Sequence, residues 1–226
     1  MHLLMADVAS MLGVEEHEVL QRVVAGELPG RKIGEEYHFL KTELDEYVLR
    51  HVVKLTPAYF SREESKGLSL ASLLLRGGLV VGIPGETVAD IIRHGIQALP
   101  AFPGLDREDC IQALLARETR LSTAVGNGIG LPHPGSPIIA DYDQESITLL
   151  RPAVPVAAPS PDGLPVHSLF IVLAANARRH LEILARLAWA LSQETVLNAL
   201  QSEVSLGTMV LLLRELDDVI PGEDFQ

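Results

Sequence analysis

The sequence predicts an α/β domain preceded by a small helix-turn-helix unit. From Leu68 onward, short continuous apolar runs alternate with longer amphipathic segments, as strands alternate with helices in α/β proteins. Before about residue 50, two short helical patterns meet at a glycine and are followed by a turn-rich, alternating stretch. The chain has 226 residues, 47% of them apolar, which is enough for one large domain or two smaller ones with a sizeable core.

The N-terminal unit is predicted over residues 1–51. Residues 5–12 have apolar positions at helical spacing and end at Gly13, and the pattern repeats before Gly26. Residues 28–40 carry Pro-Gly and Gly-Glu turns between short alternating runs, which predicts a β-hairpin, and residues 41–51 predict a third helix.

The succession ADVASMLGV, VLQRVVAGELPGRKIG and YHFLKTELDEYV resembles the excisionase/MerR-like winged-helix DNA-binding domain. This resemblance implies DNA contact, for which the candidate phosphate-contacting residues are Arg22, Arg31, Lys32 and Lys41. The front of the second helix is acidic, with glutamates 15, 16 and 18, which repel phosphates. The alternative is therefore a module used for dimerisation or protein contact.

A linker is predicted over residues 52–67, since Pro57 breaks a continuing helix and Ser61 with Glu64 forms a candidate capping box. The α/β domain is predicted over residues 68–226. Expected helices lie near 68–75, 88–99, 106–118, 177–191, 194–202 and 205–216, and expected strands at 79–83, 146–150, 154–158 and 166–175. The last run is continuously apolar, as is typical of a central strand.

Composition excludes several classes of function. The net charge of −12 does not fit a protein that grips nucleic acid tightly through phosphates. A lone cysteine, Cys110, excludes an internal disulfide, and the eight histidines form no HxxxH or HExxH pair, so no metal and no cofactor is expected. No secretion pattern opens the chain, and no apolar run approaches the roughly 20 residues of a membrane span, so we expect a cytoplasmic protein with no membrane insertion.

Candidate functional residues, together with several glycines and prolines, are concentrated in RETRLSTAVGNGIGLPHPG, residues 117–135. Prolines 132 and 134 stiffen the backbone on both sides of His133, and glycines 126, 128 and 130 allow close approach or a positive φ. Such a loop would present one imidazole to solvent while N–H groups face an anion. By itself the stretch fits an ordinary surface loop with an incidental histidine equally well.

A second histidine, His180, opens the helix that follows the central strand. His180, Leu184 and Leu187 share one helix face, so the imidazole is expected near the buried side of the helix N-terminus, where a phosphoryl group is favoured. A histidine that only bonds its neighbours at a helix start is the alternative.

Residues 68–216 resemble the fructose/mannitol/nitrogen-type enzyme IIA domain of the bacterial phosphotransferase system. The matching features are Arg117-Glu118, Ser122-Thr123, the run Gly126 to Ile129, Pro132-His133, and His180-Leu181 with Leu184. The resemblance implies a mixed β-sheet flanked by helices, with His133 as phosphoryl acceptor and His180 and Arg117 as its stabilising neighbours. It also implies a phosphate-binding loop of Ser122, Thr123, Gly126, Asn127 and Gly128, an HPr-like phosphocarrier as donor, regulatory target proteins as further partners, and a shallow, open site without metal.

This sequence departs from the family pattern at Leu121, Ala124, Gly130 and Pro134. Pro134 stands where the family has glycine, and it removes one N–H donor beside the acceptor histidine. The expected function is a regulatory phosphocarrier of the nitrogen-regulatory type that signals through protein or DNA binding. The alternative is a transcriptional regulator or protein-binding module whose IIA-like domain is not phosphorylated. A related fold of anion transporters is disfavoured by the Pro-His pair and the second histidine.

Overall fold

The computed structural model describes residues 2–12, 14–41, 43–44, 47, 67–100 and 105–217. The candidate capping box at residues 61–64 and nearly all of the predicted linker lie outside the described residues. Within these described ranges, no helix is both long and apolar enough to cross a membrane.

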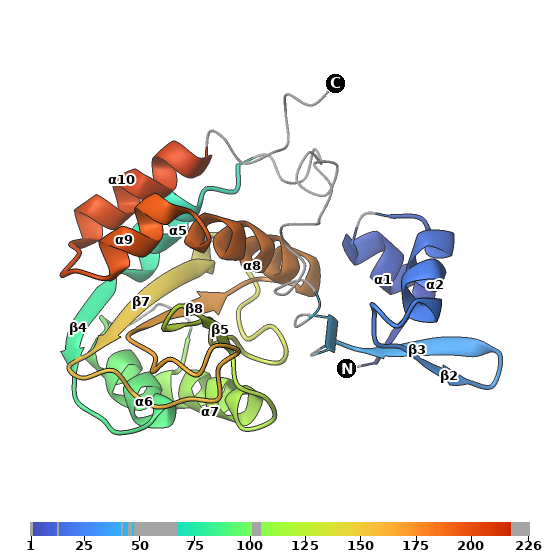
Figure 1. Cartoon of the computed structure of the whole chain (residues 1–226), viewed down its shortest axis with the longest axis horizontal. Coiled ribbons are helices and arrows are strands. Elements are labelled where there is room, and N and C mark those ends of the chain that lie inside the picture. The colour runs from blue at the N-terminus through green and yellow to red at the C-terminus, as the bar shows by residue number, and fades with distance from the viewer. Residues whose placement is uncertain are drawn as a thin grey trace.

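The described residues of the N-terminal unit include helices α1 and α2 and a three-stranded antiparallel sheet (Figure 1). Its elements are β1 (His2–Leu4), α1 (Met5–Leu12), α2 (Glu16–Val24), β2 (Arg31–Ile33) and β3 (Glu36–Leu40), with β3 in the middle of the sheet. The two helices and the hairpin occur where they were predicted, whereas β1 was not expected. Of the predicted third helix, Lys41, Glu43, Leu44 and Tyr47 are described and helical, and the remainder lies outside the described residues.

The larger domain is built on a five-stranded sheet in the order β4-β7-β8-β6-β5. Its strands are β4 (Leu79–Ile83), β5 (Ala124–Gly126), β6 (Ile129–Gly130), β7 (Ser146–Pro152) and β8 (Ser168–Leu173). Parallel pairs (β4 with β7, β6 with β8) alternate with antiparallel pairs (β7 with β8, β5 with β6), so the sheet is mixed. The strand predicted to be central, β8, is the middle strand.

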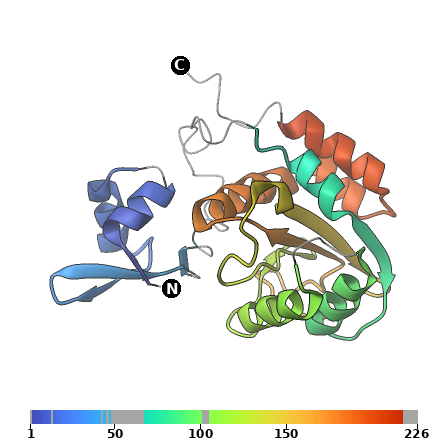
Figure 2. The same ribbon diagram turned by 180° about the vertical axis from the view of Figure 1, so that it is seen from behind.

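Helices cover both faces of this sheet, as Figures 1 and 2 show from opposite sides. One face carries α5 (Leu70–Gly77), α8 (Ala177–Leu191), α9 (Glu194–Leu200) and α10 (Leu206–Asp217), and the other carries α6 (Val88–Ala98) and α7 (Arg107–Glu118). Side chains of β8 alternate between these layers: Phe170 and Val172 face the first, and Leu169, Ile171 and Leu173 face the second. This two-sided burial explains why β8 is continuously apolar.

Three details differ from the prediction. Strands β5 and β6, of three and two residues, were missed, because strands so short show no periodicity. The strand predicted at 154–158 is reduced to isolated bridges of Val156 with Val166 and of Ala157 with Thr87. A 3-10 turn (Tyr142–Gln144) precedes β7.

Candidate functional site

His133 lies on a segment that continues β6 along the central strand. The Leu131 amide donates to the Thr123 carbonyl at 3.0 Å, and the Val172 amide donates to the Pro132 carbonyl at 3.0 Å. These bonds on both sides hold the segment as an extension of the sheet, which places His133 at the carboxyl end of β8. Ligands of open α/β sheets are commonly bound at this end of the strands.

His180 faces His133 from the first turn of α8. Asn176 caps the helix by accepting from the Arg179 amide at 2.9 Å, and the His180 amide donates to the Asn176 carbonyl at 3.0 Å. The two imidazole centroids are 4.7 Å apart, with ring planes inclined by 59°. The structure therefore brings together the two histidines that sequence reasoning paired.

A hydrogen bond of His133 fixes which ring nitrogen carries the lone pair. The Nδ1 atom lies 2.7 Å from the Leu131 carbonyl, which can only accept, so Nδ1 carries the hydrogen of the neutral ring. The lone pair is then on Nε2. A backbone carbonyl thus fixes both the tautomer and the ring orientation.

The prediction that His133 presents its imidazole to solvent is wrong. Its side chain is fully buried, at 0% exposure, and His180 is 3% exposed, so the site is neither shallow nor open. The cause is tertiary: the segment lies against β8, α8 packs over it, and prolines 134 and 137 border a small cavity beside His180.

Arg117 and Glu118 at the end of α7 anchor the loop before the histidine segment, and Glu118 is linked to that segment through Thr123. Arg117, at the end of α7, donates from Nη1 to the Leu121 carbonyl at 2.7 Å, and Glu118 accepts from the amide and hydroxyl of Thr123. Thr123 in turn accepts from the Leu131 amide. Arg117 is 2% exposed, and its Nε and Nη2 have no hydrogen-bond partner among the described residues. A buried guanidinium with unused donors is suited to an incoming anion.

The predicted phosphate-binding loop divides into two parts. Ser122 accepts from the Ala124 amide and stays with Thr123 near the histidine segment. Gly126, Asn127 and Gly128 instead form the β5–β6 turn, which lies beside the start of β8, because Ile129 pairs with Ser168. Val172, which bonds the histidine segment, lies four steps along β8 from Ser168, a distance of about 13 Å at 3.3 Å per step.

The turn therefore lies away from the histidine pair, an arrangement that does not favour the phosphate-binding role predicted for it. The positive φ of Asn127 (52°) and of both glycines serves a tight turn. The Asn127 amide is already bonded to Asp162 at 2.6 Å, and hydrogen bonds from Asn127 and Leu164 hold the pKa of that carboxyl below its usual range.

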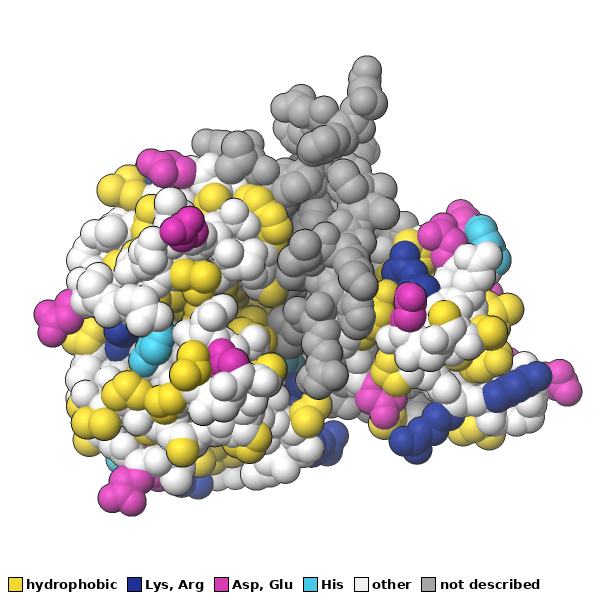
Figure 3. Space-filling model, viewed as in Figure 1, with side chains coloured by type: hydrophobic (Ala, Val, Ile, Leu, Met, Phe, Trp, Pro, Cys, Tyr) yellow, Lys and Arg dark blue, Asp and Glu magenta, His cyan; other side chains and the backbone are white. Residues whose placement is uncertain are grey.

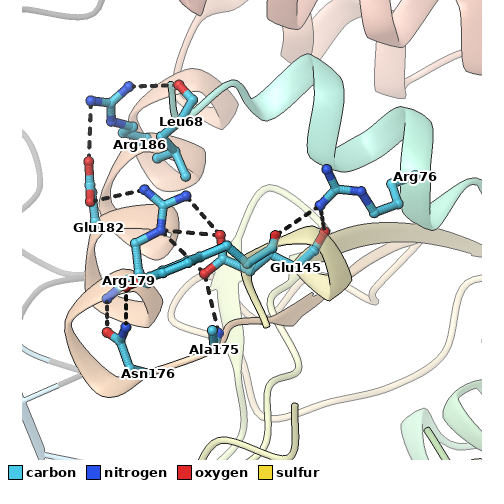
Figure 4. Close-up of polar contacts among 9 residues, drawn as sticks. Leu68, Arg76, Glu145, Ala175, Asn176, Arg179, Glu182 and Arg186 are labelled. Atoms are coloured by element: carbon cyan, nitrogen blue, oxygen red, sulfur yellow. Dashed lines mark hydrogen bonds and ion pairs between the residues drawn. The ribbon is translucent and has the colours of Figure 1, made fainter. Parts of the chain in front are cut away.

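A buried ionic network, which sequence reasoning missed, fixes the turn before α8 (Figure 4). Glu145 accepts from Arg179 Nη2 at 2.7 Å and from the Ala175 amide at 3.2 Å, and its own carbonyl accepts from Arg76. Arg179 also lies 3.7 Å from Glu182. These contacts hold the residues directly before His180. The adjacency of Arg179 to His180 was visible in the sequence, but no spacing pairs Arg179 with Glu145.

The four candidate DNA-contacting residues have different environments. Lys32 is exposed, and Arg31 is largely exposed and lies 3.7 Å from Glu43, while Arg22 lies 4.0 Å from Glu18. Lys41 is 3% exposed and lines the cavity beside His180, so its expected availability to a phosphate backbone is wrong in this arrangement. Basic and acidic side chains interleave on the N-terminal unit in Figure 3.

Comparison with known proteins identifies the larger domain. Residues 79–209, more than half of the chain, match the sequence model of the family described as "Phosphoenolpyruvate-dependent sugar phosphotransferase system, EIIA 2". The chain belongs to this family. The match lies within the 68–216 region of the resemblance, and residues 1–78 lie outside it.

Individual relatives of the EIIA domain agree with this assignment. The chain is 32% identical over 139 residues to "Nitrogen regulatory protein" of Pseudomonas aeruginosa, covering 60% of this chain and 88% of that protein. It is 33% identical over 113 residues to "PTS system fructose-specific EIIA component" of Haloferax volcanii, covering 49% and 71%.

A solved structure supports the same fold. The crystal structure of nitrogen regulatory protein IIA-Ntr from Neisseria meningitidis superimposes with a TM-score of 0.53 at 26% identity, covering 63% of this chain and 97% of that one. The mixed sheet flanked by helices is thus the fold of EIIA proteins.

Proposed function

We propose that this protein is a regulatory phosphocarrier that accepts a phosphoryl group on Nε2 of His133 from the phosphohistidine of an HPr-like carrier protein. In this proposal His180 and Arg117 stabilise the transferred group. The phosphorylation state then alters binding to regulatory target proteins or DNA. The family membership of the domain and its likeness to nitrogen regulatory proteins support this assignment.

The single observation that carries the proposal is the histidine pair. Two imidazoles 4.7 Å apart, one of them oriented by a carbonyl on Nδ1, stand at the carboxyl end of the central strand. A neutral imidazole with its lone pair on Nε2 is a competent nucleophile at neutral pH. The buried Arg117 guanidinium supplies the positive charge that phosphoryl oxygens require.

The chemistry needs no co-reactant. The Nε2 lone pair of His133 forms an N–P bond while the N–P bond of the donor breaks, and the electron pair of that bond returns to the donor imidazole. One bond is exchanged for a similar one, so the protein mainly has to position the reactants and balance charge on the phosphoryl oxygens.

The test is phosphoryl transfer from a phosphorylated HPr-type carrier in the presence of EDTA. We expect acid-labile label on the wild type and none on His133→Ala. Full labelling is expected on His94→Ala, a matched control at an exposed helical position. His180→Ala should slow transfer without shifting the labelled residue. Equal labelling of His133→Ala and wild type would refute the assignment of His133.

A second candidate function is a binding module that is not phosphorylated. The complete burial of His133 and the proline that follows it favour this candidate. It predicts no label on the wild type even at high donor concentration, with partner binding unaffected by the donor.

We further propose that the N-terminal unit contacts DNA through Arg22, Arg31 and Lys32. The helix order and hairpin support this role, whereas the glutamates at the front of α2 oppose it. A salt-dependent gel shift tests the proposal, since phosphate contacts weaken steeply as salt rises. We expect Lys32→Ala to weaken the shift, and the absence of any shift at low salt would refute DNA binding.

A further inference from the structure

Helix α8 is buried on two sides, and only one of them faces the sheet of the EIIA domain. Ile183, Leu184 and Leu187 belong to the core between α8 and the sheet. Leu181 and Ala185, both 0% exposed, belong instead to the core of the N-terminal unit, with Leu3, Val8 and Phe39 among its other members. Ala177, Ala188 and Trp189 pack against that same core, so the positions in contact with the N-terminal unit recur about every four residues along one stripe of the helix.

The N-terminal unit also reaches the two-histidine site itself. Lys41, directly after β3, is 3% exposed and lines a small cavity together with Pro134, Pro137, Ala174 and His180. Leu181, on the shared stripe of α8, follows His180 directly. One continuous contact therefore runs from the apolar stripe of α8 to the residues around His133.

The space left at this contact is too small for a phosphoryl group. The cavity has a volume of about 10 Å³, roughly the room that one water molecule needs. A phosphoryl group adds a phosphorus and three oxygens, and its donor must also bring an imidazole to within bonding distance. With His133 fully buried, neither fits beside the docked N-terminal unit.

We propose that the N-terminal unit docks over the two-histidine site and competes with the phosphoryl donor for the same surface. This surface comprises the α8 stripe (Ala177, Leu181, Ala185, Ala188 and Trp189) and prolines 134 and 137, which line the cavity with Lys41. The role of the donor rests on the proposed function, whereas the docking does not. A donor or phosphoryl group that binds only the undocked state shifts the equilibrium between the docked and undocked states toward undocking. By the same linkage, a change that favours undocking speeds phosphorylation.

The test uses the full chain with Ala185→Glu, which places a charge in the docked interface. The matched control is Ala98→Glu, the same change at an exposed position of α6. Access to His133 is measured by carbethoxylation with diethylpyrocarbonate and peptide mass spectrometry, with exposed His94 as the internal standard. We expect slow modification of His133 in wild type and in Ala98→Glu. We expect at least about fivefold faster modification in Ala185→Glu, the lower end of coupling between sites.

A second readout is the fluorescence of Trp189, the single tryptophan of the chain and a neighbour of the docked core. Its emission should shift to longer wavelength in Ala185→Glu and after phosphorylation of wild type. If Ala185→Glu fails to fold, Ala188→Glu, at a half-buried position of the same stripe, replaces it.

The outcomes separate the two proposals. Faster modification and a red shift in the interface variant, without any phosphoryl label, would retain the docking and refute the proposed function. Equal reactivity of His133 and His94 in wild type, with no change in either interface variant, would overturn the docking whether or not His133 is phosphorylated.

Discussion

Replacing Glu145 by glutamine should destabilise the EIIA domain by about 2–3 kcal/mol, a magnitude that follows from the network in Figure 4. The Glu145 side chain is 1% exposed and forms a 2.7 Å ion pair with Arg179. Breaking a buried pair by removing one partner costs about 3–5 kcal/mol when the remaining charge is uncompensated. Arg179 stays 14% exposed and keeps Glu182 at 3.7 Å, which lowers the expected cost below that range.

The converse change, Arg179→Met, should cost more, about 4 kcal/mol. It leaves the almost completely buried Glu145 carboxylate with only the Ala175 amide, 3.2 Å away, among its side-chain contacts in this network. In the double variant neither charge remains, so its cost should be smaller than the sum of the single costs by at least about 1 kcal/mol.

The assay is urea unfolding at pH 7, with the free energy of unfolding taken from the midpoint at a constant m-value. A cost below about 0.5 kcal/mol for Glu145→Gln, the range of ordinary surface changes, would refute the paired role of Glu145 and Arg179. Strict additivity in the double variant would refute it as well. Either result would mean that Glu145 and Arg179 do not act as a pair in holding the turn before His180.

Three further predictions concern the rest of the larger domain. Gly77→Ala places a Cβ 2.2 Å from the Ile147 carbonyl oxygen and should lower the free energy of unfolding by about 3 kcal/mol. Gly207→Ala, whose Cβ meets nothing closer than 3.8 Å, should raise the free energy of unfolding by about 0.5–1 kcal/mol, and equal urea midpoints of the two variants would contradict this. Burial raises the pKa of the Cys110 thiol to about 11, so Ellman's reagent at pH 8 should label it only after unfolding; rapid labelling of the native chain would refute this. Burial, and to a lesser extent the charge of Arg151, lowers the pKa of His167 below 6.5, so the unfolded chain binds this proton more tightly and stability is lost as pH falls below about 6.5. His167→Gln should flatten the dependence of the free energy of unfolding on pH in urea titrations, and an unchanged dependence would contradict this assignment.

Much of the fold followed from local patterns. The helices of the larger domain and the strands β4, β7 and β8 were predicted because their apolar periodicity is long enough to distinguish helix from strand. Strands β5 and β6 were missed because their two or three residues owe their conformation to neighbouring strands. For the same reason, residue patterns gave none of the strand pairings; the family resemblance implied only that the sheet is mixed, and the structure supplied the pairs.

The sequence by itself determined two candidate site residues: a histidine between prolines, and a second histidine at the start of a helix. Tertiary structure decided their environment. The Gly126–Gly128 turn lies at the start of the central strand β8, whereas the histidine pair lies at its carboxyl end. The direction and pairing of the strands decide at which edge of the sheet a loop lies, and its glycine content does not. His133 is buried because its segment lies against β8 under α8, and Lys41 lies beside His180 because the N-terminal unit packs on α8. Contacts between segments more than a hundred residues apart depend on shape and apolar area, which no local pattern encodes.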